Sequence, residues 1–537
     1  MAIAPAQRRL AEALAALKAL QDAGAVVLRS ADLTRAQREG LLANGFLRQV
    51  VKGWYMPARP DEVAGDTTPR FAAMRDFIAG YCDSRFGAQW YLSPEASLPL
   101  HAGSTRLPLQ VVVHSPLAKN GLLQLPGGCS LLDYQAKDFA PADRVERVLG
   151  LQVLALPQAL IRVAEVFFRS RPADAQIALH RLPDASDLNR ELLEGGRSVV
   201  AGRLSGALRA VGRPALADDV LATMRSAGYV VTETDPFDDV AGSAAVASTT
   251  LARSRSASPY VMRMRLMWRA MRPVVLKAFP PEPGLPADAK AYLQAVDDVY
   301  RTDAYHSLSI EGYRVTDALI QRVTAGDWNP QTHANDADSR NAMAARGYWL
   351  AHNAVKLSIR KLLETGNARG ALAAHASAAG EVARADHRTW FRQLFAPSVD
   401  ARILVAADLA GYRAHQVYIR NAAHVPPPKE AVRDMMPALF DLLAREPSAA
   451  VRAVLGHFMF VFIHPYMDGN GRIGRFLMNA MLASGGYPWT VIRLERRAQY
   501  MAALDAASAE ANIQPFARFV ASCMRHHVAG ANPTRRT

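Results

Sequence analysis

The sequence has few cysteines, too few acidic residues to balance its basic ones, and no long apolar run. Its three cysteines, Cys82, Cys129 and Cys523, are too few for a disulfide framework and too far apart for a CxxC site. The most apolar run, Phe458–Ile463, falls far short of the roughly 20 residues that span a bilayer, and the N-terminal segment lacks the apolar core of a signal peptide. We therefore expect a soluble, cytoplasmic protein without a membrane partner.

The length and charge of the chain favour a multidomain protein with a polyanionic partner. A chain of 537 residues exceeds what one hydrophobic core usually fills. Half of the residues are hydrophobic and 21% are charged, as in globular proteins. The net charge of +14 favours binding to nucleic acid or to nucleotide phosphates.

Residues 1–60 are predicted to form a small helical unit closed by a hairpin. Leucines recur at spacings of three and four in the first helix, and Thr34 can cap a second helix, Arg35–Ala43. β-prone residues then flank a turn at Lys52-Gly53. Lysine and arginine outnumber aspartate and glutamate nine to four in this segment, so its surface is basic.

The two helices and the basic hairpin resemble the winged helix of abortive-infection-type antitoxins. That family often shows a pattern G-L-x-R-V-x-x-G-x-Y, and this chain has Gly45-Phe46-Leu47-Arg48-Gln49-Val50 followed by Gly53-Trp54-Tyr55. The resemblance implies DNA binding through residues 1–60. The alternative is a small packing domain with a solvated basic face.

The remaining chain divides by composition into three parts: a mixed α/β middle domain at 61–235, a linker and lead-in helix at 236–285, and a last domain at 286–530. In the middle domain, Gln110–His114 and Leu151–Ala155 are predicted strands, and Leu160–Phe168 and Asp187–Leu208 are predicted helices. Antitoxin-like proteins of the family named above carry an α/β domain here, which implies a scaffold. The linker is rich in Ala, Ser and Asp and lacks helical periodicity.

The last domain is predicted to be strongly helical. Its predicted helices are Ala289–Arg301, Ala342–Glu364, Glu381–Phe395, Lys429–Glu446, Ala449–Phe462, Arg472–Ser484 and Arg496–Ala511.

One segment of this domain, His464–Arg475, gathers residues suited to nucleotide chemistry. Pro465 ends the preceding apolar helix, and two glycines free the backbone just before a new helix, so unpaired N–H groups form an anion cradle. Arg472 and Arg475 lie on one face of the first turn and can bind phosphate oxygens. Asp468 offers an oxygen ligand for Mg²⁺, and His464 has the side chain of a general base.

Three other interpretations of this segment are weaker. An EF-hand calcium loop is excluded because Arg472 stands where the third oxygen ligand is required and Asn479 stands where the terminal glutamate is required. A Walker A loop is excluded because no Gly-Lys-Ser/Thr follows. An ordinary turn does not account for a base, an acid and two arginines within twelve positions.

The segment resembles the signature of the Fic family of nucleotidyltransferases, His-Pro-Phe-x-Asp/Glu-Gly-Asn-Gly-Arg-x-x-Arg, with Tyr466 in place of Phe. The resemblance implies an all-α fold with a β-hairpin flap, and transfer of AMP from ATP to a protein hydroxyl. Its implied roles are a base (His464), a Mg²⁺ ligand (Asp468) and phosphate-binding residues (Gly469, Asn470, Gly471, Arg472 and Arg475). Family members that phosphorylate carry lysine at the position of Gly471, which favours AMP transfer here.

A second match, Ser307-Leu308-Ser309-Ile310-Glu311-Gly312, resembles the inhibitory motif of the same family. Ser307 and Glu311 share a helix face, and Gly312 ends the turn. The resemblance places Glu311 against Arg475, where a carboxylate would occupy the site of the γ-phosphate. In some relatives the same glutamate supports removal of AMP, so the reverse reaction remains an alternative.

Two further features complete the resemblance. Val417, Tyr418 and Ile419 are β-prone within a helical domain and resemble the flap hairpin that docks an extended target segment. Tyr500 stands where the family often has an aromatic residue near the adenine, although a core or surface tyrosine is an equal alternative.

The sequence thus predicts a mainly α, multidomain, self-inhibited AMP transferase that uses ATP and Mg²⁺ and acts on a Ser, Thr or Tyr hydroxyl. The alternatives are an AMP-removing enzyme and a DNA-binding regulator with an accessory Fic domain. Self-modification is a further expectation.

Overall fold

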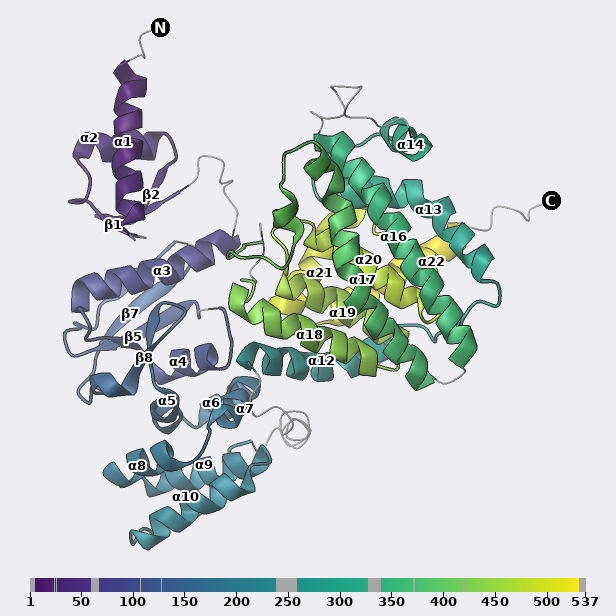
Figure 1. The fold of residues 1–537 in the computed structure, drawn as a ribbon. Helices are drawn as coiled ribbons and strands as arrows, with labels where there is room; N and C mark the ends of the chain where they lie inside the picture. Colours follow the sequence, from purple (N-terminus) through teal and green to yellow (C-terminus); the bar gives the residue numbers. More distant parts are fainter. Residues whose placement is uncertain are drawn as a thin grey trace. The chain divides into compact units, whose positions relative to one another are not determined.

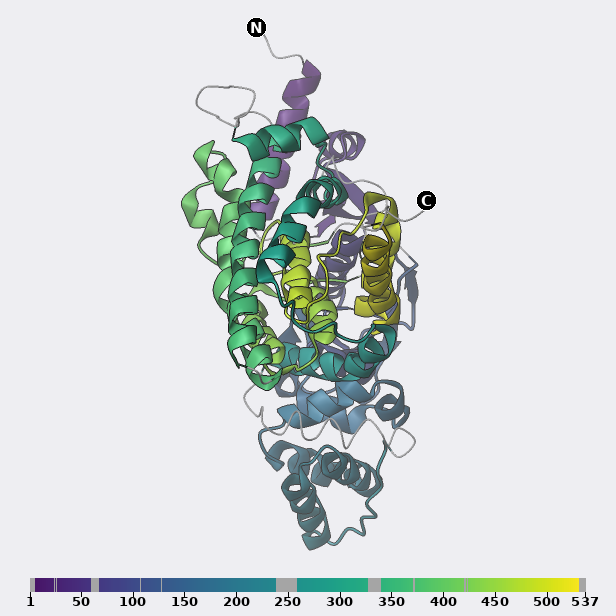
Figure 2. The same ribbon diagram turned by 90° about the vertical axis from the view of Figure 1, so that its right-hand side faces the viewer.

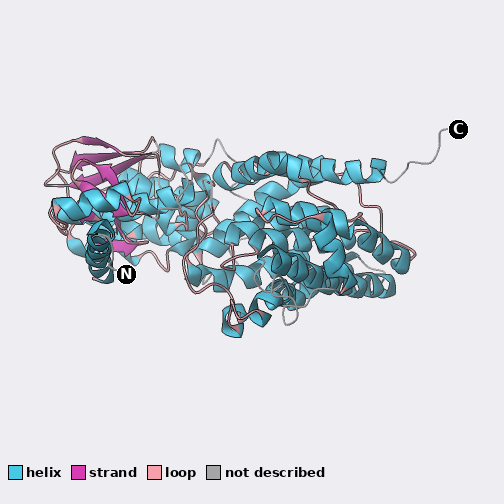
Figure 3. Cartoon of the chain, turned by 90° about the horizontal axis from the view of Figure 1, so that it is seen from above, coloured by secondary structure: helices cyan, strands magenta, loops and turns pink. Residues whose placement is uncertain are grey.

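A computed structural model of the chain describes residues 5–23, 25, 27–58, 67–106, 108–126, 128–237, 258–326, 340–369, 372–419, 422 and 424–530. The chain separates into two compact units: Met1–Arg263 with Tyr418–Val425, and Met264–Val417 with Pro426–Thr537. All described strands lie between residues 28 and 154, and the rest of the regular structure is helical (Figures 1 and 3). The predicted mainly α chain with a mixed α/β N-terminal region is therefore confirmed.

The first unit begins with a small domain of two helices and three strands. Its elements are α1 (Pro5–Asp22), β1 (Leu28–Arg29), α2 (Arg35–Ala43), β2 (Leu47–Val51) and β3 (Trp54–Pro57). The strands form an antiparallel sheet in the order β1-β3-β2. Thr34 accepts a hydrogen bond from the Gln37 N–H and so caps α2, and Gly53 has the positive φ of +84° that the hairpin turn requires. Both features were predicted from the sequence.

A six-stranded mixed sheet follows, in the order β6-β7-β5-β4-β9-β8. The pairs β5–β7 and β4–β9 are parallel, and the other neighbouring pairs are antiparallel. Side chains of α3 and of the central strands share one buried cluster that includes Phe77, Val113 and Leu131. The strands are β4 (Tyr91–Leu92), β5 (Gln110–Ser115), β6 (Leu122–Gln124), β7 (Ser130–Gln135), β8 (Val145–Val148) and β9 (Leu151–Leu154), and the helices among them are α3 (Thr67–Phe86) and α4 (Pro94–His101).

The helices that complete this unit correct two predictions. The predicted helix Leu160–Phe168 is divided, because Val163 has ψ 143° and leaves the helical region. The predicted helix Asp187–Leu208 is also divided, because Gly196 takes a φ of +58°. The observed helices are α5 (Leu156–Arg162), α6 (Val166–Ser170), α7 (Pro172–Arg181), α8 (Ser186–Glu194), α9 (Ser198–Ala210) and α10 (Pro214–Ser226).

The second unit is a bundle of helices around α19 and α20. Figure 2 shows these yellow-green helices between the green helices α16–α18 and the yellow helices α21 and α22. Nearly every residue of α19 is buried, which explains why its sequence is apolar on all sides. The helices are α12 (Pro259–Ala278), α13 (Ala289–Ile310), α14 (Asp317–Ala325), α16 (Arg340–Arg369), α17 (Leu372–Asp400), α18 (Lys429–Arg445), α19 (Ala449–Ile463), α20 (Asn470–Ala483), α21 (Arg497–Ala509) and α22 (Gln514–Gly530).

The lead-in helix α12 packs with the second unit from Met264 onward. Arg272 pairs with Glu446 at 2.8 Å, and the Tyr487 hydroxyl donates to the Pro280 carbonyl oxygen at 2.7 Å. The predicted boundary at residue 60 and much of the predicted linker lie outside the described residues. The division into four parts stays a prediction.

The described residues of the predicted flap hairpin form no strand. The described residues of 411–428 contain no strand, so Val417, Tyr418 and Ile419 lie in an irregular segment. Two side chains donate to carbonyl oxygens of this segment: Gln416 to the Pro426 oxygen at 3.0 Å, and Arg413 to the Pro427 oxygen. The prolines themselves have no N–H to donate to a neighbouring strand.

Among the described residues, no helix combines the length and the apolar character needed to cross a bilayer.

Candidate active site

The predicted base stands at the junction between α19 and the loop that leads to α20. His464 ends α19 with φ 53° and ψ 60°, a left-handed conformation that few residues other than glycine adopt. Its N–H donates to the Phe460 carbonyl oxygen at 3.0 Å and closes the last helical turn. Pro465 then prevents the helix from continuing, as its position in the sequence predicted.

The His464 ring is held as a neutral base. Nδ1 lies 3.2 Å from the Val461 carbonyl oxygen, and because a carbonyl oxygen can only accept, Nδ1 carries the proton. Nε2 therefore keeps its lone pair. Burial lowers the pKa of His464 to about 4, although the Val461 carbonyl opposes this shift. The ring is thus neutral at ordinary pH and ready to accept a proton at Nε2.

The loop between the two helices is closed by Asn470 and anchored by Tyr466. The Asn470 side chain accepts from the Tyr466 N–H at 2.9 Å and donates to the Tyr466 carbonyl at 2.8 Å. The Tyr466 ring stacks on Phe391 with centroids 3.7 Å apart. The side chain of Asn470 is therefore occupied within the loop, which leaves its backbone N–H for the predicted phosphate contact.

The first turn of α20 presents the remaining predicted groups. Gly469 is its N-cap with φ +81°, and the N–H groups that follow have no partner within the helix. Asp468 Oδ2 accepts from Arg472 Nη2 at 3.2 Å while its side chain remains 62% exposed. The Arg472 guanidinium is buried between the rings of Tyr313 and Phe395. A carboxylate thus faces solvent beside a row of free donors.

Arg475 connects α20 to the Ser307–Gly312 segment. Its Nε donates to Ser307 Oγ at 2.8 Å, and its Nη2 donates to the Ser307 carbonyl at 3.0 Å and to Glu311 Oε1 at 2.8 Å. Burial alone would lower the pKa of Arg475, but the Glu311 carboxylate leads the interactions that raise it above its usual value. The pair that the sequence predicted is therefore present.

The Glu311 carboxylate also lies against the start of α20. A Cβ added at Gly471 would collide with Glu311 Oε1, so a larger residue there would displace this carboxylate. Glu311 caps the end of α13, and Gly312 takes the φ of +86° that turns the chain away. An anion of the protein itself thus sits at the cationic end of α20.

The arrangement fits an anionic ligand larger than one carboxylate. Among the described residues, Arg472 Nε and Arg475 Nη1 are buried donors without a hydrogen-bond partner. Within the described ranges, no group of three His, Cys, Asp or Glu side chains could hold a metal ion. Asp468 alone is still compatible with Mg²⁺, because that ion is often held by one carboxylate together with phosphate oxygens and water.

Tyr500 lies in the core, which favours that alternative over contact with an adenine. Its side chain is 2% exposed, its hydroxyl lies 2.8 Å from His457 Nε2, and its ring lies against Phe516 and Phe519. Burial raises the pKa of Tyr500 to about 12.

Several residues at this site have no signal in the sequence motif. Tyr313 and Phe395 hold Arg472, and Asp303 accepts a 2.6 Å hydrogen bond from Tyr348 beside Arg475. Burial raises the pKa of Asp303 to about 6. These residues come from helices and loops far from His464–Arg475 in the sequence, so local spacing could not indicate them.

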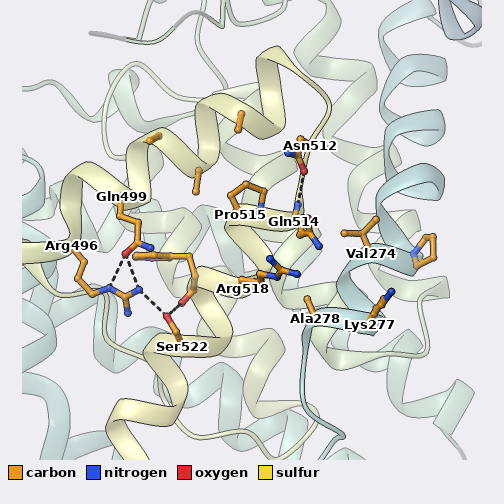
Figure 4. Close-up of a pocket in the computed structure, with 15 residues that line it drawn as sticks. Val274, Lys277, Ala278, Arg496, Gln499, Asn512, Gln514, Pro515, Arg518 and Ser522 are labelled. Atoms are coloured by element: carbon orange, nitrogen blue, oxygen red, sulfur yellow. Dashed lines mark hydrogen bonds between the residues drawn. The ribbon is translucent and has the colours of Figure 1, made fainter.

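A separate groove of about 1260 Å³ lies between α12, α21 and α22 (Figure 4). Its charged lining residues are Lys277, Arg496 and Arg518. Arg496 turns toward Gln499 and Ser522, to which it donates hydrogen bonds at 2.9 and 2.8 Å. The groove contains none of the predicted site residues.

Residues 383–482 match the sequence model of the family described as the Fic/DOC family. Two curated relatives are both named protein adenylyltransferase Fic. The one from Nematostella vectensis is 30% identical over 246 residues, which cover 44% of this chain and 50% of that protein. The one from Drosophila virilis is 29% identical over 237 residues, which cover 43% of each. The chain spans half or less of the length of these relatives.

A solved structure of a Fic-1 segment from C. elegans is 17% identical to this chain. The match covers 68% of this chain and 98% of that one, with a TM-score of 0.35. This TM-score is too low to establish a shared fold.

Proposed function

We propose that this chain transfers AMP from ATP to a Ser, Thr or Tyr hydroxyl of a target protein, and that Glu311 restrains the reaction. The observation that carries the proposal is the neutral His464 at one end of a loop whose other end presents the donors of α20. The Fic/DOC match and the adenylyltransferase relatives support the same activity.

In this reaction His464 Nε2 takes the proton of the target hydroxyl. The hydroxyl oxygen attacks the α-phosphorus of ATP, a new P–O bond forms, the α–β phosphoanhydride bond breaks, and pyrophosphate leaves. The N–H groups at the start of α20, together with Arg472 and Arg475, bind the phosphates and stabilise the developing charge. Asp468 would hold Mg²⁺, which would supply further charge neutralisation at those phosphates.

Glu311 restrains this reaction by pairing with Arg475, the side chain that would bind the outer phosphate of ATP. Its carboxylate pairs with Arg475 and fills the space above Gly471. A phosphate at that position would bring two anions together in a largely buried site, which is unfavourable unless Glu311 moves away. Self-inhibition through Ser307, Glu311 and Gly312 follows from this competition.

The test is incubation of the Glu311→Gly protein with α-labelled ATP, Mg²⁺ and cell lysate. We expect label on protein, and we expect none when His464→Ala is added to the same background. Glu311→Gln is the matched variant, because it keeps the shape of the side chain and removes its charge. Label that persists in the His464→Ala protein would contradict the role of His464.

Removal of AMP is the alternative for the same site. If Glu311 orients a water molecule, Glu311→Gly abolishes removal of AMP from a modified protein rather than increasing transfer. Assaying both directions with the same variant separates the two activities, and self-modification is detected as label on the chain itself.

A second candidate function is DNA binding by residues 1–60 as a winged helix. It is supported by the arrangement of α1, α2 and the β2–β3 hairpin, and by the net basic charge of this segment. Removal of residues 1–60 should abolish a DNA mobility shift that weakens steeply with salt. We further propose a cytoplasmic location for this protein.

A further inference from the structure

A buried arginine outside the motif is bonded to the backbone of the proposed base. Arg413 is 5% exposed and lies in the irregular segment that precedes α18. Its Nε donates to the His464 carbonyl oxygen at 2.8 Å, and its own N–H donates to the Pro465 carbonyl oxygen at 2.8 Å. Two consecutive peptide groups at the end of α19 are thus held by one residue that lies about fifty positions earlier in the chain.

The same guanidinium also holds the segment that follows it. Nη1 donates to the His415 carbonyl at 3.0 Å, and Nη2 donates to the Pro427 carbonyl. The Gln416 side chain donates to the neighbouring Pro426 carbonyl at 3.0 Å. One side chain therefore bonds to His415 and Pro427 as well as to the peptide that carries His464.

The backbone of His464 needs such support. A residue other than glycine in the left-handed region costs about 1 kcal/mol or more and stays there only when its surroundings enforce it. A charged donor on the His464 carbonyl stabilises the C-terminal end of α19 through the helix dipole. In this backbone conformation the ring Nδ1 lies 3.2 Å from the Val461 carbonyl oxygen, the contact that sets the tautomer.

We propose that Arg413 is a positioning residue for His464, which holds the ring in place and links it to His415 and Pro427. The inference rests on the proposed AMP transfer and adds a residue that the family motif does not contain. Arg413 does not touch the reacting atoms, so it acts only through the backbone and the ring of His464.

The pKa of the His464 ring provides a second measure of its contact with Arg413. Three charged groups act on the His464 ring: Arg413, Glu311 and Asp468. Among these three, only Arg413 lowers the pKa of the ring. Arg413→Lys keeps the charge but cannot reach three carbonyl groups, whereas Arg413→Met removes both the charge and the hydrogen bonds. The two variants therefore separate positioning from electrostatics.

The experiment places both variants in the full-length Glu311→Gly chain, with Arg388→Met as the matched control. Arg388 lies over the Tyr412 ring beside the same segment, so its loss removes a nearby cation of the same type. We expect both Arg413 variants to lower kcat by roughly tenfold to a hundredfold, with the KM for ATP nearly unchanged, as displacement of a catalytic group does. The control should keep its kcat.

The titration of the His464 ring is measured in the same proteins by NMR of histidine-labelled chains, with His464→Ala identifying the signal. We expect Arg413→Met to raise the pKa of the ring and Arg413→Lys to leave it nearly unchanged. An unshifted ring in Arg413→Met, or a kcat loss matched by an equal loss of folded protein, would overturn the proposal. If Glu311→Gly shows no AMP transfer, the proposed function fails, and the ring titration still decides the role of Arg413.

Discussion

At the scale of single residues, the Tyr466 hydroxyl is energetically unfavourable. The ring anchors the loop by stacking on Phe391, but its hydroxyl is buried without a hydrogen-bond partner among the described residues. Burial also raises the pKa of Tyr466 above its usual value. A buried polar group without a partner costs free energy of folding, so this hydroxyl opposes the stability that the ring provides.

Tyr466→Phe should therefore keep the activity and raise the free energy of unfolding by about 1 kcal/mol. Thermal or denaturant unfolding measures the change. Tyr500→Phe is the matched control, because the Tyr500 hydroxyl is bonded to His457 and its loss should destabilise the protein. A Tyr466→Phe protein that unfolds more easily would show that the hydroxyl has a partner.

The protonation of His464 gives a prediction for the pH dependence of transfer. On the proposed mechanism transfer requires the neutral ring, and burial lowers the pKa of that ring to about 4. The rate should therefore stay level as the pH falls from 8 to about 5, whereas a histidine with the usual pKa of about 6.5 would lose most of its activity over that range. The rate of the Glu311→Gly protein, with circular dichroism at each pH, tests this. Half-maximal activity near pH 6.5 would contradict it.

At the scale of elements, the packing of α16 on α17 depends on a glycine. A Cβ added at Gly347 in α16 would collide with the backbone oxygen of Leu394 in α17. Leu394 lies next to Phe395, whose ring covers Arg472, so this helix pair supports one wall of the candidate site. The close approach cannot be kept with any larger residue.

Gly347→Ala should lower the free energy of unfolding by about 1–3 kcal/mol, because backbone atoms cannot move aside as side chains can. Gly411→Ala is the control, since a Cβ there would have no heavy atom within 4 Å. Equal stability of the two variants in denaturant unfolding would show that α16 and α17 can separate at no cost.

The sequence predicted the elements near the motif well, because there local signals and tertiary packing agree. Pro465, Gly469 and the apolar α19 determine the helix–loop–helix at His464 with little help from distant residues. Val417–Ile419 are β-prone but form no strand among the described residues, where Arg413 and Gln416 donate to the carbonyl oxygens of Pro427 and Pro426. Tyr313 and Arg413 could not be found from spacing, since only tertiary structure brings them to the site.

At the scale of the whole molecule, the two proposed activities belong to different compact units. Residues 1–60 lie in the first unit, and His464, Arg475 and Glu311 all lie in the second. The Fic/DOC match covers residues 383–482, most of which belong to the second unit. We infer that the two activities can be removed one at a time.

The chain without residues 1–60, in the Glu311→Gly background, should transfer AMP at the parent rate but lose the DNA shift. The full-length His464→Ala chain should show the opposite pattern, because a histidine at the lip of a loop contributes little to packing. Measuring both activities in both proteins tests this separation. DNA binding that survives the truncation would move that activity to another part of the chain.

The left-handed backbone at His464 has a consequence for attempts to increase the stability of this protein. Glycine and asparagine adopt that conformation more easily than histidine does. Replacement of His464 by glycine would relieve this strain and, on the proposed function, would abolish transfer. On the proposed function, His464 therefore exchanges some stability of the folded chain for a base at the end of α19.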